Sequence, residues 1–307
     1  MARGRIVVVG SCNMDLCIVS ERLPEPGETI LGGDFHTSPG GKGANQAVAA
    51  ARAGSAVDFV GCLGEDMFGN ELIANLRKER VSVDFTVRER KIRTGVALIM
   101  VDSKGENMIS VAPGANAALT TAVIERARLR TRDADFCLVQ MEISPDAVRH
   151  AVDMAYRENT RVMLNAAPAP SEPLREEILR QVEVLVVNTG EAETLSGVQI
   201  TDDTAADEAA RTLQRLGARN VVITMGSKGS LVCGDECVFV PAREVEVVDT
   251  VGAGDAFCGG LVTLLAEGET LVESARFATA AAALACTKIG AQASLPARTD
   301  IESLWRT

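Results

Sequence analysis

The segment Asp249-Thr-Val-Gly-Ala-Gly-Asp255-Ala-Phe257 leads directly into the apolar stretch Cys258 to Leu265, a pattern that predicts a glycine turn followed by a buried helix. The peptide N–H groups at the start of a helix, together with its dipole, attract negative charge. A carboxylate beside such a turn can orient an alcohol and accept its proton while the N–H groups stabilise a transferring phosphoryl group. The segment therefore predicts a kinase. Taken alone, it also fits an ordinary capped helix with an acidic first turn.

The size and charge of the chain restrict its class. Its 307 residues, 47% of them hydrophobic, predict one α/β domain over 1–307 with an appended lid. The formal net charge of −11 opposes binding to nucleic acid, because polyanions are bound by clustered Lys and Arg. No apolar stretch is long enough for a membrane helix and the N-terminus is a poor signal peptide, so we expect a cytoplasmic protein with no membrane partner.

The eight cysteines do not form a zinc-binding pattern. Cys233 and Cys237 are the nearest pair, and only two histidines are present to complete a metal site. Buried cysteines of cytosolic proteins are usually reduced and pack as small apolar side chains. We therefore expect free, mostly buried thiols, and neither a disulfide nor a zinc site.

Short apolar strands alternate with helical patterns along most of the chain. The helical patterns lie at Lys42 to Arg52, at about Asn70 to Glu79 and at Asp203 to Leu216. This alternation predicts a doubly wound, mostly parallel sheet flanked by helices, with ligands at the carboxyl ends of the strands. We expect strands at Arg5 to Gly10, Val57 to Cys62, Phe136 to Met141, Arg161 to Asn165, Val182 to Asn188 and Asn220 to Thr224.

Two segments, at about 12–39 and 93–112, interrupt the alternation. The first carries several Pro and Gly residues between short β-prone pieces. The second predicts a hairpin with strands Val96 to Val101 and Asn107 to Val111 around a turn at Ser103-Lys104-Gly105. Together we expect them to form a small antiparallel sheet that acts as a lid.

Two polar segments near the N-terminus are candidate ligand sites. Asn13 and Asp15 follow the first strand and share one face if the chain stays extended, which suits recognition of sugar hydroxyls; a turn or cap is the alternative. The segment Gly40-Gly41-Lys42-Gly43-Ala44-Asn45-Gln46 is not a P-loop, but its glycines admit a ligand to the backbone. Lys42 and Asn45 share a helical face there, although an ordinary helix start with a solvated lysine also fits.

Three later segments follow predicted strands. Glu142 comes after the strand ending at Met141, where a plain loop charge is the alternative. Asn188 and Glu191 have oxygens that could hold magnesium through water, or could cap a helix. The loop Thr224-Met-Gly-Ser-Lys-Gly229 could cradle nucleotide phosphates, or could be a hairpin turn. Their common placement at strand ends favours one ligand site.

The glycine-rich motifs resemble those of the carbohydrate kinase family that includes ribokinase. Gly40 to Gln46 is similar to the family's first signature and Asp249 to Phe257 to its second, and the resemblance covers nearly the whole chain. It implies a ribokinase-like α/β fold and ATP-dependent phosphorylation of D-ribose at its 5-hydroxyl. Further similar segments are Asn13-Met-Asp15, Pro113-Gly-Ala-Asn116, Gln140-Met-Glu142, and Gly290-Ala-Gln292 followed by Ser294.

The same resemblance implies roles for single residues. Asp255 would be the general base, and Gly252, Ala253 and Gly254 would form the anion hole. Thr279 would lie beside adenine, where relatives often carry Asn or His. Substrate would contact Asn13, Asp15, Gly41, Lys42, Asn45, Glu142 and Asp255, under the lid side chains Ala97, Ile99 and Val111. The nucleotide would contact Asn188, Thr224, Gly226, Ser227, Gly229, Gly254 and Thr279.

Metal ions and a second subunit are also implied by the resemblance. Magnesium would bind through water at Asn188 and Glu191, and the lid would pair two subunits into a homodimer. Potassium would bind, mostly through backbone carbonyls, at Asp249, Val251, Ala285, Lys288, Gly290 and Ser294.

Other functions stay open. A kinase of the same family could act on deoxyribose, fructose, adenosine or pseudouridine, and a non-catalytic sugar sensor is a further alternative that the acidic residue and glycine turn argue against. A dehydrogenase is disfavoured because Val9-Gly10-Ser11-Cys12-Asn13 lacks the Gly-x-Gly-x-x-Gly phosphate turn.

Overall fold

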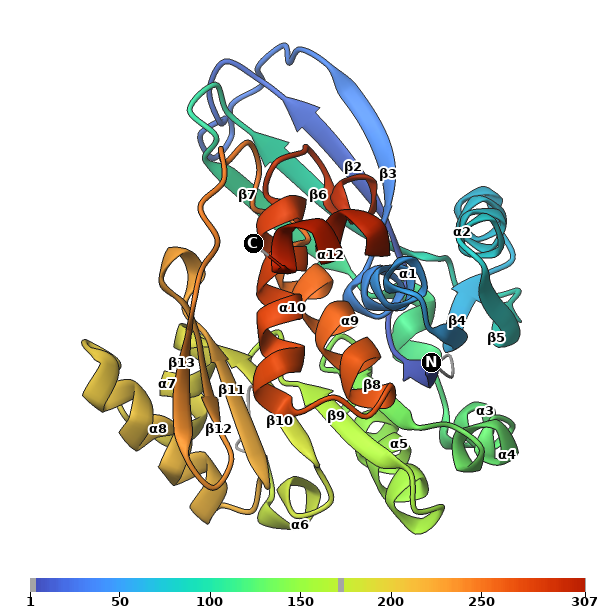
Figure 1. Ribbon diagram of the computed structural model, residues 1–307. Coiled ribbons are helices and arrows are strands. Elements are labelled where there is room, and N and C mark those ends of the chain that lie inside the picture. Colours follow the sequence, from blue (N-terminus) through green and yellow to red (C-terminus); the bar gives the residue numbers. More distant parts are fainter. Residues whose placement is uncertain (1–3, 171–173, 307) are drawn as a thin grey trace.

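The large sheet of the computed structural model has nine strands in the order β13-β12-β11-β10-β9-β8-β1-β4-β5 (Figure 1). The structure describes residues 4–170 and 174–306. Strands β1, β4, β5 and β8 to β11 pair in parallel, while β12 and β13 are antiparallel, which confirms the mostly parallel sheet. The strands are β1 (Arg5–Val9), β4 (Ala56–Gly64), β5 (Val81–Glu89), β8 (Phe136–Gln140), β9 (Arg161–Asn165), β10 (Val184–Asn188), β11 (Asn220–Thr224), β12 (Gly229–Cys233) and β13 (Cys237–Pro241).

The strand order reverses between β1 and β8. The chain first adds β4 and β5 on one side of β1, and then places β8 to β11 on the other side. Connections that diverge in this way leave a crevice at the carboxyl ends of the strands, where ligands of open α/β sheets bind. The fold therefore positions a site near the ends of β1 and β8.

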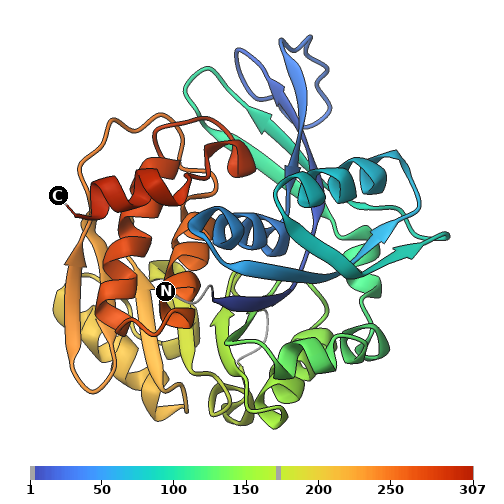
Figure 2. The same cartoon turned by 45° about the vertical axis from the view of Figure 1, so that its right-hand side comes forward.

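Helices cover both faces of the large sheet (Figures 1 and 2). Alternate residues of β1 explain this: Ile6 and Val8 enter one hydrophobic core, and Val7 and Val9 enter the other. The first core lies under α1 (Lys42–Ala53), α2 (Met67–Lys78), α9 (Ala253–Ala266), α10 (Leu271–Ala285) and α12 (Arg298–Trp305). The second lies under α3 (Thr121–Glu125), α4 (Arg128–Arg132), α5 (Pro145–Arg157), α6 (Glu176–Leu179), α7 (Thr189–Ser196) and α8 (Asp203–Arg215).

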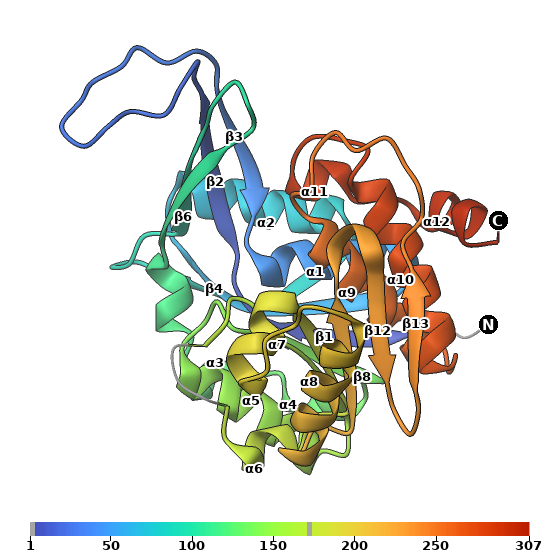
Figure 3. The ribbon, with the colours of Figure 1, turned by 90° about the vertical axis from the view of Figure 1, so that its left-hand side faces the viewer.

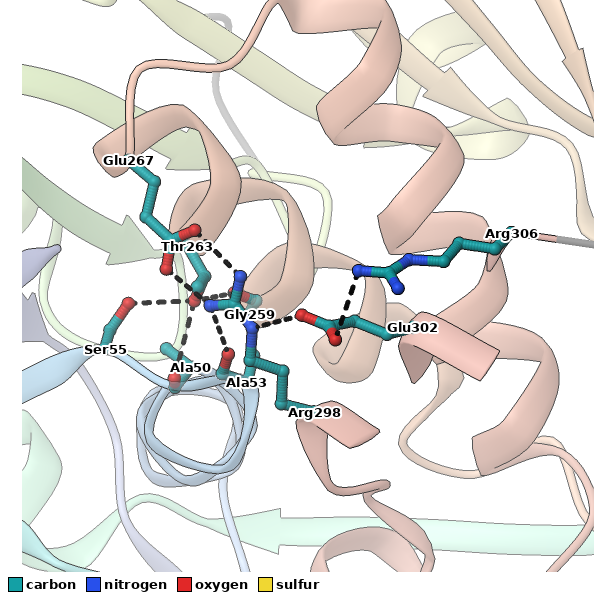
Figure 4. Close-up of polar contacts among 9 residues, drawn as sticks. All are labelled: Ala50, Ala53, Ser55, Gly259, Thr263, Glu267, Arg298, Glu302 and Arg306. Atoms are coloured by element: carbon teal, nitrogen blue, oxygen red, sulfur yellow. Dashed lines mark hydrogen bonds and ion pairs between the residues drawn. The ribbon is translucent and has the colours of Figure 1, made fainter. Parts of the chain in front are cut away.

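Helices α1 and α9 are in close contact. A Cβ added to Gly259 would lie 2.4 Å from the Cβ of Ala49, so glycine is required for this approach. Further along the same contact, Ser55 Oγ donates to Thr263 Oγ1 over 3.0 Å, and Thr263 Oγ1 donates to Gly259 O over 2.8 Å (Figure 4). Because the helices pack so closely, the first turn of α9 lies beside the first turn of α1.

A second sheet of four strands, here called the small sheet, has the order β3-β2-β6-β7 and projects from the α/β body (Figure 3). The antiparallel pairing of β6 with β7 confirms the predicted hairpin. The expectation of a wholly antiparallel sheet is wrong, because β2 and β6 are parallel: they continue from β1 and β5, which already run in one direction. Its strands are β2 (Asn13–Val19), β3 (Phe35–Gly40), β6 (Gly95–Val101) and β7 (Asn107–Ala112).

The expectation of free thiols is wrong for one pair. Cys233 and Cys237 form a disulfide, because the antiparallel pairing of β12 with β13 places them opposite each other across a tight turn. The other six cysteines are free and mostly buried. Strand β5 was not expected from the sequence, since its charged residues obscure the apolar alternation at this edge of the sheet. Within the described residues, no helix combines the length and apolar character that crossing a membrane requires.

Candidate active site

A cavity of about 220 Å³ opens where β9, β10 and β11 end and α9 begins. Its walls combine Lys42, from the first fifth of the chain, with residues that lie more than 120 positions later, so only the folded chain forms it. The lining residues are Lys42, Asn165, Ala167, Val186, Asn188, Glu191, Thr224, Thr250, Gly252, Gly254, Asp255 and Cys258.

The start of α9 forms one wall of this cavity. Gly252 has a φ of +81°, and a Cβ there would lie 2.9 Å from Ala291 O, so glycine is needed at this turn. The first bond of the helix runs from Ala256 N to Gly252 O, which leaves the N–H groups of Gly254 and Asp255 ahead of the helical ladder. Open space surrounds the position of a Cβ at Gly254. An anionic group could therefore approach these N–H donors closely.

Asp255 is buried, with 8% of its surface exposed. Its Oδ2 accepts a hydrogen bond from Asn45 Nδ2 and its Oδ1 accepts one from Gln46 Nε2, each over 2.9 Å. Burial raises the pKa of Asp255 and the nearby Glu142 adds to the rise, while Lys42 and the two amides oppose it. A carboxylate with a raised pKa binds a proton more readily, which suits a general base that deprotonates an alcohol.

Lys42 begins α1 directly after Gly41, whose φ is +87°. A Cβ on Gly41 would lie 2.7 Å from a backbone nitrogen of β2, so glycine is required here as well. Burial opposes the charge of Lys42, but nearby carboxylates, chiefly Asp255 and then Glu142, outweigh it and raise the pKa of Lys42. The side chain lines the cavity as a cation and can compensate charge on a phosphoryl group.

Glu142 follows β8 and lies behind the first turn of α1. Its Oε2 accepts hydrogen bonds from Ser11 Oγ over 2.6 Å and from Lys42 N over 3.0 Å. Asn13 is held similarly, because its Oδ1 accepts from Asn116 Nδ2 over 2.7 Å. Both side chains are thus oriented by neighbours that the sequence did not single out for this purpose.

Asp15 lies in β2 two residues after Asn13, and the extended strand puts both on one face of the small sheet. Burial raises the pKa of Asp15 to about 7, and the negative charges of Glu142 and Asp255 contribute to this rise. The three carboxylates therefore lie near enough to influence one another, which links the small sheet to the start of α9.

The apolar residues expected over the substrate belong to the same face of the small sheet. Ala97 pairs with Asp15 on one side and with Val111 on the other, so these three form one row across three strands. Ile99 lies one row further out, opposite Cys17. Ala97 is buried, whereas Val111 is 48% exposed.

Asn188 and Glu191 form a capping box at the start of α7. Glu191 N donates to Asn188 Oδ1, and Asn188 N donates to Glu191 Oε2, both over 2.8 Å. The capping alternative is therefore realised. Both residues also line the cavity, and burial raises the pKa of Glu191. Since a carboxylate oxygen has more than one lone pair, capping leaves acceptor capacity for water bound to a metal ion.

The loop after β11 carries the residues expected to contact nucleotide. Thr224 ends β11 and lines the cavity, and a short 3₁₀ helix at 226–228 follows. Gly226 has a φ of +57° with open space around it, and Ser227 is exposed. Gly229 has a φ of +120° and begins β12. The loop thus extends outward from the cavity at the carboxyl end of β11.

Thr279 lies in α10 and does not line the cavity. It is buried, and its Oγ1 donates to Ala275 O over 2.8 Å within the same helix. This hydroxyl is engaged by its own helix. A ligand beside Thr279 would therefore contact mainly its methyl group.

Asp249 joins the two loops expected to hold a monovalent cation. Its Oδ1 accepts from Val251 N over 3.0 Å and its Oδ2 accepts from Gly290 N over 2.8 Å. Among the described residues Asp249 takes part in no ion pair. An unpaired carboxylate between two loops is compatible with a bound cation.

The remaining residues of this group lie close by along the chain. Ala285 ends α10, and Ser294 ends α11 (Ala291–Ser294), where its Oγ donates to Ala291 O over 2.8 Å. Lys288 lines a different cavity, of about 480 Å³, between α10 and α12.

Three further residues, Gln46, Thr250 and Cys258, belong to the site although the sequence predicts no role for them. Gln46 Nε2 donates to Asn165 Oδ1 over 2.9 Å as well as to Asp255, and Thr250 and Cys258 line the cavity. Burial, and then the charge of Asp255, raises the pKa of Cys258 well above its ordinary value, so the thiol stays protonated. One signal was present: Gln46 is a polar residue next to Asn45 in a helix otherwise rich in Ala.

A doubly wound sheet that brings a helix start, a buried carboxylate and a lysine around one cavity defines an α/β enzyme built for phosphoryl transfer. A family model described as pfkB family carbohydrate kinase matches residues 3–298. The chain belongs to this family of carbohydrate kinases.

Individual relatives extend over nearly the whole chain. Ribokinase of Haemophilus influenzae is 37% identical over 299 residues, which cover 97% of both proteins. Deoxyribokinase of Salmonella typhi is 34% identical over 292 residues, 95% of both. The structure of Arabidopsis thaliana ribokinase complexed with ribose and ATP covers 100% of both chains with a TM-score of 0.89 and 32% identity.

Proposed function

We propose that this carbohydrate kinase transfers the γ-phosphoryl group of ATP to the 5-hydroxyl of D-ribose. The observation that carries the proposal is the position of Asp255, a buried carboxylate held by two amides at the start of α9 and facing the cavity that Lys42 also lines. Similarity to ribokinases over nearly the full chain favours ribose as the acceptor.

In this proposal Asp255 accepts the proton of the hydroxyl as its oxygen attacks phosphorus. In the Gly252-Ala253-Gly254 turn, Ala253 N donates to Thr250 O over 3.3 Å, so the N–H groups of Gly254 and of Asp255 after it would receive the charge that develops on the transferring group, and Lys42 would compensate part of it. The donors are fixed by the backbone before substrate arrives, so no reorganisation is needed during the reaction.

The sugar is proposed to lie between the small sheet and α1. Its hydroxyls would meet the polar side chains of Asn13, Asp15 and Glu142 and the backbone of Gly41. Asn45 Nδ2 donates one hydrogen to Asp255, and its second hydrogen, which has no acceptor within residues 4–170 and 174–306, could bind a hydroxyl. A row of buried partners would reject sugars that lack a matching hydroxyl. Ala97 and Val111 would exclude water above the sugar.

The nucleotide is proposed to lie along the ends of β10 and β11, with its phosphates toward Gly254. Magnesium held through water by Asn188 and Glu191 would neutralise phosphate charge there, and their oxygen donors fit such an ion. Potassium at the Asp249 loop would hold the glycine turn in shape, since carbonyl oxygens and one carboxylate suit a weakly hydrated cation.

The test is ADP release by the purified protein with ribose, 2-deoxyribose, fructose, adenosine and pseudouridine. We expect ribose to give the highest kcat/KM, and an Asp255→Asn control to lower the signal by about 10²- to 10⁴-fold. A higher kcat/KM with 2-deoxyribose would identify the second candidate, which the similarity to a deoxyribokinase favours. Sugar binding without ADP release would support the sensor alternative.

A homodimer through the small sheet is part of the proposal. One face of that sheet carries exposed apolar side chains at Ile18, Phe35, Leu98 and Met108, which are 40 to 61% exposed. Exposed apolar patches of this kind mark interaction surfaces. Light scattering should show a dimer, and Leu98→Glu should convert it to a monomer; a wild-type monomer would contradict the proposal.

A cytoplasmic location is also proposed, on the basis of ATP as phosphoryl donor. The disulfide between Cys233 and Cys237 is the observation that opposes it, because disulfides are rare in that compartment. Cell fractionation, combined with thiol labelling of the isolated protein, tests both points.

A further inference from the structure

Two buried glutamines lie behind Asp255, and the proposed function gives neither a role. Gln140 ends β8 and Gln292 lies in α11; they are 0% and 5% exposed. Gln140 Nε2 donates to Gln46 Oε1 over 2.7 Å, and Gln292 Nε2 donates to Asn45 Oδ1 over 3.0 Å. Each glutamine therefore contacts one of the two amides that hold Asp255.

The direction of these hydrogen bonds follows from the chemistry of the carboxylate. Ionised Asp255 only accepts, so Asn45 and Gln46 must turn their NH₂ groups toward it and their oxygens away. Those oxygens are buried and need donors. Gln292 and Gln140 supply them. An amide turned the other way would place an oxygen against the carboxylate and leave a buried NH₂ group without an acceptor.

Gln292 is itself held in a fixed orientation. Its Oε1 accepts from Asn75 Nδ2 of α2 over 2.7 Å, and its backbone carbonyl accepts from Arg52 Nη1 over 2.8 Å. Arg52 in turn forms an ion pair with Glu79 over 2.8 Å. The chain from Asn75 through Gln292 and Asn45 to Asp255 thus has one polarity throughout.

The side chain of Gln140 is fixed mainly by close packing. A Cβ on Gly10 would lie 2.1 Å from Gln140 Oε1, so the glutamine fills the space that this glycine leaves. That oxygen is buried and has no hydrogen-bond partner among the described residues. A buried amide oxygen without a partner is destabilising. The hydrogen bond that the Nε2 of the same side chain donates to Gln46 explains why a glutamine occupies this position.

From this geometry we infer that Gln140 and Gln292 are positioning residues: they fix the amide orientation of Gln46 and Asn45 and thereby hold Asp255 ionised and aimed into the cavity. The inference rests on the proposed role of Asp255 as the base. Loss of either donor leaves a buried amide oxygen without its partner and weakens the orientation of that amide, less so for Gln46, whose Nε2 also donates to Asn165 Oδ1. The hydrogen bond that favours the charged form of the carboxylate is then weakened. The pKa of Asp255 then rises, and its carboxylate is held less firmly in the direction of the cavity.

The test uses Gln292→Met and Gln140→Met, which keep volume and remove the donor. For each, we expect kcat to fall roughly 10- to 100-fold with the KM for sugar changed less than about threefold. We also expect the acidic limb of the kcat profile to move to higher pH by about one unit. Asn75→Leu, on the partly exposed face of α2, should shift the limb in the same direction by a smaller amount.

Thr263→Val is the matched control. It removes the buried hydrogen bond that Thr263 Oγ1 of α9 donates to Ala50 O of α1 over 3.4 Å, and the bond that it accepts from Ser55 after α1, without touching the amides that hold Asp255 (Figure 4). It should lower the melting temperature and leave the pH profile in place. The inference would be overturned if the glutamine variants fold and the acidic limb of their pH profile does not move. If the methionine variants do not fold, an unchanged acidic limb in Asn75→Leu would overturn it.

A direct measurement separates this inference from the proposed function. The ¹³C carboxyl resonance of Asp255 should titrate at higher pH in the methionine variants than in the wild type, whether or not Asp255 is the base. An active Asp255→Asn variant would refute the base while leaving that titration shift intact. An unshifted titration together with an inactive Asp255→Asn variant would refute the positioning role alone.

Discussion

Asn45 Nδ2 donates to Asp255 Oδ2 over 2.9 Å although 210 residues separate the two in the sequence. The bond joins the two glycine-rich segments of the chain, one at the start of α1 and the other at the start of α9. Because α1 and α9 pack closely through Gly259, a single helix pair presents lysine, amides and carboxylate to one cavity.

Replacement of Asp255 by Asn should preserve the fold and lower kcat by about 10²- to 10⁴-fold, the usual range for loss of a general base. The amide is nearly isosteric but cannot accept the proton. Steady-state ADP release and circular dichroism measure the two effects. Asp300→Asn, on α12 away from the cavity, is the control and should retain full activity. Near-normal turnover by folded Asp255→Asn would exclude the base role.

Glu142→Ala should weaken ribose binding by roughly 2 to 5 kcal/mol, because charged hydrogen bonds in a desolvated site are lost and Ser11 Oγ loses its acceptor. The affinity for ATP should change much less. Calorimetric titration with each ligand separately gives both values, and Glu125→Ala on the surface serves as control. A loss of ATP affinity with ribose affinity intact would mean that the two subsites are exchanged.

The stability of the unliganded protein should depend on pH through Asp15. Its pKa is about 7 in the folded protein, against about 3.9 in an unfolded chain. The folded state therefore binds more protons between these values, so the free energy of unfolding falls as pH rises from about 4 to 7. Asp15→Asn should remove this loss and be more stable than wild type at pH 8, by at most about 4 kcal/mol.

Denaturant unfolding of both proteins at pH 4, 6 and 8 measures the effect of Asp15. The difference should be small at pH 4, where Asp15 of the folded wild type is protonated and that of the unfolded chain is only about half ionised. Asp34→Asn, an exposed residue of the β2–β3 loop, is the control and should not change the pH dependence. Equal stability of Asp15→Asn and wild type at pH 8 would contradict the raised pKa.

Potassium should activate the enzyme more than sodium, and Asp249→Ala should remove most of that activation. The physical reason is that a cation at this loop would hold the Gly252 turn in the shape its N–H donors require, which affects rate more than binding. Assays in an organic-cation buffer, with potassium titrated back, measure kcat. An unchanged kcat across the titration would show that the loop holds no functional cation.

Glu267→Ala should destabilise the protein by about 1 to 3 kcal/mol. The side chain of Glu267 is 5% exposed and its Oε2 accepts from Arg298 Nη2 over 2.9 Å, so its loss leaves a partly buried guanidinium without its main partner (Figure 4). Arg306→Ala is the control: this arginine is 72% exposed and pairs with Glu302 over 3.6 Å, and its loss should cost less than about 1 kcal/mol. Equal effects in urea unfolding would contradict the difference in burial.

Much of the fold could be predicted because its signals are local. The apolar runs of β1, β8 and β11 and the helical pattern of α8 lie in single windows of sequence. The parallel direction of β6 relative to β2 could not be predicted, because it depends on the shared direction of β1 and β5, the strands of the large sheet that precede them. The disulfide between Cys233 and Cys237 also follows from strand pairing and not from composition.

By itself the sequence determined the glycine turn before Asp255, the helix that follows it and the parallel architecture, since turn chemistry and apolar periodicity act between near neighbours. Only the tertiary structure decided which groups hold Asp255. Gln46 and Gln140 lie 94 residues apart, and Asn45 and Gln292 lie 247 apart. Burial at the meeting point of these segments removes water as an alternative partner, so each amide must take the orientation that satisfies the next one.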